Sequence, residues 1–189
     1  MKPGFIMSEF KSRALLWLTI LVAATLLLGC QAKPPPLSPA AASFKHEIKN
    51  CLTNLSVALM EPVAKKDVAA INAALEKVES PAVKLCRLCP FQVGVLSPLG
   101  EALAIYPPKS GNGRKNYSSY DLVTKAINTK KIQQQRFFLQ DGSELYIICA
   151  PLVREDKVIG LIVIAINSRE AEKRWGFQGE EFLDLDFNS

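Results

Sequence analysis

The sequence predicts an α+β domain in which N-terminal amphipathic helices precede an antiparallel five-stranded sheet. Apolar residues recur at helical spacing in two segments, and five later segments are apolar and of strand length. The strands are joined by short turns or by one short helix, and this order of elements is typical of an α+β fold.

Residues 1–29 are predicted to be an export signal. Basic residues precede an uncharged apolar run from Ala14 to Leu28, which is shorter than the roughly 20 residues that span a bilayer. The run Leu27-Leu28-Gly29-Cys30 resembles a bacterial lipobox, which implies a lipoprotein acylated at Cys30. Gln31 then favours the periplasmic side of the outer membrane over the inner membrane. An uncleaved anchor and an ordinary signal peptide are the alternatives.

A Pro-rich tether, residues 30–42, is predicted to link this anchor to one domain, residues 43–189. Ser43 is the expected N-cap of a first helix that continues to about Met60 and stops at Pro62. Its apolar stripe consists of Phe44, Ile48, Cys51, Leu55 and Leu59. A second helix is expected from the cap Asp67 to Ser80-Pro81, with Val68, Ile71, Leu75 and Val78 on one face.

The sheet and its connections follow. Ser97-Pro98-Leu99-Gly100 has the residues of a type I turn, and Asp141-Gly142-Ser143 is a hairpin signal. A short helix to about Lys130 is expected to begin with a Ser118/Asp121 capping box, and a last one, capped by Ser168, to stop at Gly176. The acidic tail, Gly179 to Ser189, is either helical or loose. The expected strands are Phe91–Leu96, Ala102–Tyr106, Gln134–Gln140, Glu144–Val153 and Val158–Ile166.

Charge and cysteine content limit the classes of function. The formal net charge of +5 is spread along the chain and argues against a nucleic-acid partner. One disulfide between Cys51 and either Cys86 or Cys89 is expected, with no disulfide as the alternative, and Cys149 is expected to be a buried thiol or a further partner.

Catalytic signals are weak. Cys86-Arg87-Leu88-Cys89 is a CxxC pair. Pro90 follows where haem attachment needs histidine, which argues against covalent haem. Because a CxxC pair can exchange disulfides, a thiol-disulfide redox protein is kept as an alternative. The sequence has one histidine, His46, and no G-x-S-x-G motif, so a serine–histidine hydrolase site has little support. We therefore expect no enzyme, no metal site and no cofactor.

Several motifs together resemble single Cache domains, a PAS-related family of extracytoplasmic sensors. Val93-Gly94-Val95-Leu96 with the following turn is similar to their first hairpin, and Asn116-Tyr117-Ser118-Ser119-Tyr120 is similar to the segment over their pocket. The end of the domain, with Asp141-Gly142, Ala150-Pro151-Leu152 and Ile159-Gly160, is similar as well. The resemblance implies a domain that binds organic acids, amino acids or amines. We expect no output module in this chain, so a membrane-bound partner would have to carry the signal.

The candidate ligand-binding residues follow from this resemblance. Tyr117 and Tyr120 would cover the pocket, and Arg136 could hold a carboxylate in bidentate fashion. Strand alternation places Phe138 on the same face as Arg136, and Tyr146 lies on the neighbouring strand. In the alternative interpretation Phe138 and Tyr146 belong to the core and Arg136 points into water. A structural or assembly lipoprotein that binds another protein is the remaining alternative for the function.

Overall fold

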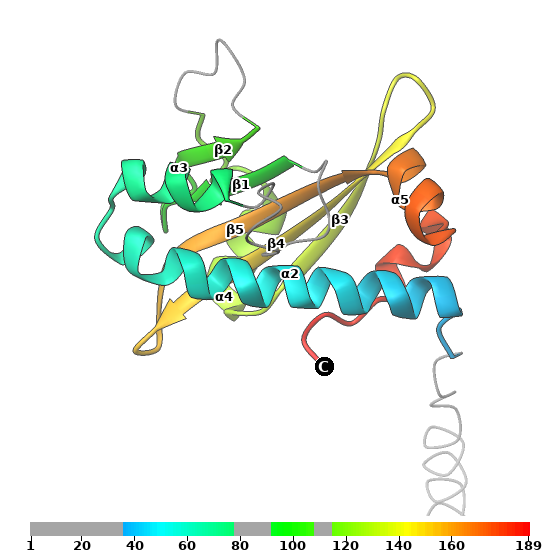
Figure 1. The fold of residues 1–189 in the computed structure, drawn as a ribbon, viewed down its shortest axis with the longest axis horizontal. Helices are drawn as coiled ribbons and strands as arrows, with labels where there is room; N and C mark the ends of the chain where they lie inside the picture. The colour runs from blue at the N-terminus through cyan, green and yellow to red at the C-terminus, as the bar shows by residue number, and fades with distance from the viewer. Residues whose placement is uncertain (1–35, 78–91, 108–114) are drawn as a thin grey trace, which may run out of the picture. The chain divides into compact units, whose positions relative to one another are not determined.

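Antiparallel pairing organises the whole sheet in the computed structural model, which describes residues 36–77, 92–107 and 115–189. The strand order is β2-β1-β5-β4-β3, so the last strand in the chain lies at the centre (Figure 1). The α+β class and the five-stranded antiparallel sheet predicted from the sequence are confirmed. The strands are β1 (Gln92–Leu96), β2 (Ala102–Tyr106), β3 (Gln133–Phe138), β4 (Glu144–Arg154) and β5 (Lys157–Asn167).

Helix α2 (Pro39–Ala64) lies along one face of the sheet (Figure 1). Its predicted apolar stripe is buried throughout, but the predicted start and end are wrong. Ser38, and not Ser43, is the N-cap, because its hydroxyl accepts a hydrogen bond from the Ala41 amide at 3.1 Å and proline follows at the first helical position. The helix continues through Pro62, since a proline in the last turn removes only one backbone hydrogen bond.

Helix α3 (Val68–Glu76) begins as predicted, because the Asp67 carboxylate accepts a hydrogen bond from the Ala70 amide at 2.9 Å. Ile71 and Leu75 are buried, whereas Val68, expected on the same face, is 39% exposed. The predicted end of this helix lies outside the described residues.

Alternate side chains of the strands point to opposite faces of the sheet. On one face, here called the α2 face, they pack against α2, α3 and the C-terminal residues in the larger apolar core. The other, here called the α4 face, packs against α4 (Asp121–Thr129) in a smaller cluster with Leu122, Val123 and Ala126. The α2 face therefore holds the main core, and within the described ranges the helix that covers the α4 face is the short α4.

The C-terminal residues, which the sequence left open, belong to the α2-face core. Helix α5 (Ser168–Trp175) is capped by the Asn167 side chain and not by Ser168, and it ends at Gly176 as predicted. The 3-10 helix η1 (Gly179–Asp184) follows. Buried apolar side chains of this part of the chain are Phe177, Phe182, Leu185 and Phe187.

The C-terminal segment also contacts the start of α2. The Glu181 carboxylate accepts hydrogen bonds from the Ser38 amide at 3.0 Å and from the Ser38 hydroxyl at 2.6 Å. Gly179 lies so close to the Tyr146 hydroxyl and the Glu144 carboxylate that a side chain there would collide with both. These contacts join the two ends of the unit formed by Leu37–Ser189.

None of the helices in the described ranges is both long and apolar enough to cross a membrane. The predicted signal, residues 1–29, and Cys30 lie outside those ranges, and so do residues 31–35 of the predicted tether.

Candidate ligand-binding site

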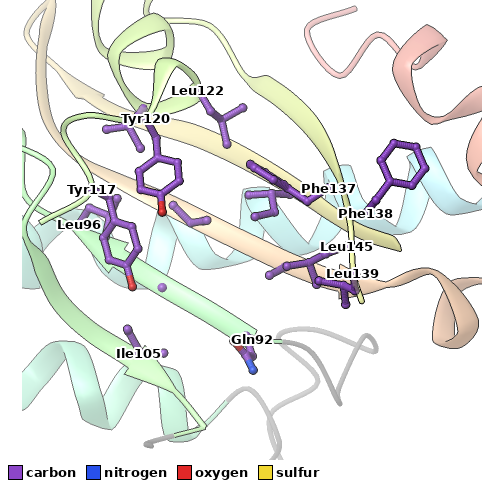
Figure 2. Close-up of a pocket in the computed structure, with 15 residues that line it drawn as sticks. Gln92, Leu96, Ile105, Tyr117, Tyr120, Leu122, Phe137, Phe138, Leu139 and Leu145 are labelled. Carbon is purple, nitrogen blue, oxygen red and sulfur yellow. The ribbon is translucent and has the colours of Figure 1, made fainter. Parts of the chain in front are cut away.

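A cavity of about 410 Å³ opens on the α4 face, between the sheet and the segment that leads into α4 (Figure 2). Strands β1, β2, β3, β4 and β5 all contribute to its lining, together with α4 and the residues before it. Its lining residues include Gly94, Tyr117, Tyr120, Leu122, Phe137 and Ala165.

Small residues form the floor of the cavity. Gly94 on β1 is paired with Ile105 on β2 and with Val163 on β5, and Ala165 on β5 lies on the same face two residues further on. An ideal Cβ placed on Gly94 would make only ordinary contacts, the nearest being 3.8 Å from the Val163 Cβ. The floor is therefore open because Gly94 has no side chain, and not because the backbone needs glycine there.

Two tyrosines form the wall on the α4 side. Tyr117 and Tyr120 project from the segment before α4 toward the sheet (Figure 2), with ring centroids 5.9 Å apart and a tilt of 44°. The Tyr117 amide donates a hydrogen bond to the Gly100 carbonyl at 2.7 Å. Gly100 has φ +77°, and a Cβ there would lie 2.7 Å from the Ser118 amide nitrogen, so glycine permits this close approach.

The start of α4 differs from the prediction. Tyr120 occupies the N-cap position, so Ser118 is not the cap of a capping box. The Ser118 amide donates instead to the Asn116 side-chain oxygen at 2.7 Å, which fixes the turn that carries both tyrosines.

The wall opposite the two tyrosines is formed by the end of β3 together with Leu139 and Leu145. Phe137 points into the cavity, whereas Phe138 points away from it and is 74% exposed (Figure 2). Phe138 therefore borders the cavity only at its rim, although it was predicted as a ligand contact.

Arg136 and Tyr146 do not line the cavity, which corrects their predicted placement in a pocket. They are partners in the β3–β4 register, and alternation turns both toward the α2 face. Arg136 donates to the Gly179 carbonyl at 3.1 Å, lies 3.6 Å from the Glu144 carboxylate and stacks over the Phe138 ring at 5.1 Å. The guanidinium thus binds the C-terminal segment to the sheet.

Tyr146 is a core residue, as the alternative interpretation held. It is 1% exposed and stacks on Phe182 with a centroid distance of 4.6 Å. Burial raises the pKa of Tyr146 to about 12, and the neighbouring Glu144 carboxylate acts in the same direction.

Neither of the two cysteines in the described ranges, Cys51 and Cys149, lines the cavity. Cys51 is disulfide-bonded, while Cys86 and Cys89 lie outside the described residues. Cys149 is a free buried thiol on the α4 face, and burial raises its pKa to about 12. Within the described ranges, no three His, Cys, Asp or Glu side chains lie together in a way that could hold a metal ion.

The sequence reasoning missed most of the sheet residues that line the cavity. These are Gln92, Gly94, Leu96, Ile105, Phe137, Leu145, Ile147, Val163 and Ala165. The available signal was Gly94 and Ala165, two small residues within strands whose other members are mostly large and apolar.

Comparison with known proteins identifies the fold. No protein-family model and no curated protein matches the chain. The extracellular domain of vpHK1S-Z8, assigned as a histidine kinase, is similar with a TM-score of 0.56 at 14% identity, over 71% of this chain and 55% of that one. An extracellular ligand binding receptor from Desulfohalobium retbaense has a TM-score of 0.51 at 12% identity, over 77% and 24%.

The fold is thus Cache-like, as the sequence resemblance implied. The chain spans about half of the first of these structures and about a quarter of the second.

Proposed function

We propose that this chain is a lipid-anchored sensor of the bacterial envelope that binds a small molecule and acts through a partner protein. The cavity on the α4 face carries the proposal. Its volume of about 410 Å³ falls in the range of ligand pockets, about 300–1,000 Å³, and its lining has the expected mixture of many apolar and a few polar groups. The fold supports the proposal, since both similar structures are extracellular domains.

The anchor is proposed from the sequence. The lipobox-like run ending at Cys30 would give a diacylated N-terminus, and two acyl chains are enough for stable membrane attachment. Gln31 supports sorting to the outer membrane, and the Pro-rich residues that follow would extend the domain away from the bilayer. Replacing Cys30 with serine should abolish labelling by radioactive palmitate and release the protein from the membrane fraction.

A ligand screen tests the sensing role. The full mature chain is heated in lipid nanodiscs while its tryptophan fluorescence is recorded. Nanodiscs are used because free detergent could fill an apolar cavity. A ligand at about 100 times its dissociation constant should add about 2.7 kcal/mol to the free energy of unfolding. The control is Gly94→Leu, which fills the cavity floor. A flat response across organic acids, amino acids, amines and neutral compounds would favour a structural or assembly role.

We further propose that Cys51 pairs with Cys86 or Cys89, because Cys149 is free. Such a bridge would remove one member of the CxxC pair from thiol exchange, which supports a structural role over a redox one. Peptide mapping without reduction identifies the partner. Insulin reduction by the wild type, lost when Cys86 and Cys89 are changed to serine, would instead favour the redox protein.

A further inference from the structure

The charge of the cavity lining is the property that most restricts its ligand. All the lining side chains in the described part of the chain are uncharged, and most are apolar. Their polar side-chain groups are the hydroxyls of Tyr117 and Tyr120 and the amide of Gln92. A ligand in this cavity can therefore receive one or a few hydrogen bonds, but it meets no ionic partner on the described lining.

The charged groups nearest in sequence to the lining do not supply one. Arg136 is directed to the α2 face, where Glu144 and the Gly179 carbonyl already occupy it. Asp121 is the first residue of α4 and is exposed. A charged ligand seated over Gly94 and Ala165 would lose hydration without gaining an opposite charge, and an unpaired buried ion is strongly unfavourable.

The geometry of the tyrosines also argues against a cation enclosed between their two rings. A cation–π site needs the cation over a ring face, within about 6 Å of its centroid, and a cage needs several such faces around it. Tyr117 and Tyr120 are in contact with each other, at 5.9 Å and 44°, so a trimethylammonium group cannot lie between them. The pair instead forms one continuous aromatic wall.

We infer that the cavity binds an uncharged, mostly apolar small molecule whose one or two polar groups meet Tyr117, Tyr120 or Gln92. This inference rests on the proposed sensing function and narrows its ligand class. It departs from the organic acids, amino acids and amines that the family resemblance implied.

Small aromatic probes of different charge test the inference. Benzyl alcohol and benzamide are neutral, while benzoate, benzylamine and benzyltrimethylammonium are charged. Each is titrated into the full mature chain in nanodiscs, with ligand-observed NMR to measure the dissociation constant. We expect the neutral probes to bind at least about tenfold more tightly than the charged ones.

Two variants separate the site from its surroundings. Gly94→Leu should weaken neutral-probe binding at least about tenfold without lowering the thermal midpoint, because a Cβ at this position makes only ordinary contacts and glycine is itself unfavourable inside a strand. Arg136→Gln should leave binding of every probe unchanged, since Arg136 faces the other side of the sheet.

The outcomes test the ligand class and the sensing function separately. Charged probes that bind as tightly as neutral ones, with binding lost in Gly94→Leu, would overturn the ligand class but keep the sensing function. The same holds for neutral-probe binding that is weakened by Arg136→Gln. No binding by any probe, or binding that Gly94→Leu leaves intact, would overturn the ligand class, and a flat response in the wider screen would then overturn the sensing function too.

Discussion

Substitution of Phe182 tests whether the C-terminal segment is a structural part of the domain. Its side chain is 0% exposed, stacks on Tyr146 at 4.6 Å and 17°, and meets the edge of Phe44 at 6.4 Å and 73°. Phe182 thus joins β4 to α2. Its neighbour Leu183 is 54% exposed and provides a control at the adjacent position.

The expected loss follows from burial and from the two ring contacts. Burying a phenylalanine contributes about 1.5–3 kcal/mol, each aromatic pair adds about 0.5–1.5 kcal/mol, and truncation leaves a cavity. Phe182→Ala should therefore cost about 3–5 kcal/mol, the usual range for this substitution in a core. With a urea dependence of about 2 kcal/mol/M, the unfolding midpoint should fall by about 1.5–2.5 M.

Equilibrium urea unfolding, followed by tryptophan fluorescence, measures this difference. Leu183→Ala should change the free energy of unfolding by less than about 0.5 kcal/mol, as is usual for an exposed position. Similar small shifts for both variants would refute the reasoning, because they would mean that the segment from Gly179 onward contributes little to the core.

Three further predictions concern titratable groups. Hydrogen bonds from the Ser38 hydroxyl and then from its amide lower the pKa of Glu181. The stability that this carboxylate contributes is therefore present above the ordinary carboxyl pKa and is lost on acidification. Between neutral pH and about pH 3, Glu181→Gln should therefore lose less stability than the wild type. Burial raises the pKa of Tyr146 to about 12, so the stability linked to its neutral form is present below the unfolded tyrosine pKa and is lost as the pH rises toward about 12. Absorbance titration should show a late tyrosinate signal that Tyr146→Phe removes. Because burial raises the pKa of Cys149 to about 12, iodoacetamide at about pH 8 should label it only after unfolding, as mass spectrometry of its peptide would show.

Local patterns predicted the elements better than their ends. The stripe on α2 follows from helical periodicity, so Phe44 to Leu59 were placed correctly. The start was misplaced because Ser38-Pro39 lies inside a Pro-rich stretch that resembles a tether, although serine followed by proline is also a helix-start signal. Burial of the last residues could not be predicted, because it depends on Phe44 and Tyr146, which are distant in sequence.

The site could be predicted only in part for a related reason. Tyr117 and Tyr120, predicted through the resemblance, line the cavity, and alternation correctly put Arg136 and Phe138 on one face of β3. Which face is hollow is not a local property, however. It depends on the strand order and on which helices cover each side, so Arg136 was assigned to the wrong side.

Alternation along β5 places some side chains in the main core and others in the cavity lining, so the two sets are open to different substitutions. Its even-numbered residues Ile162, Ile164 and Ile166 belong to the main core, whereas Val163 and Ala165 line the cavity. Substitutions at Val163 and Ala165 could thus retune recognition while the even-numbered isoleucines keep the protein folded. A library randomised at Val163 and Ala165 alone would sample new specificities on an unchanged scaffold.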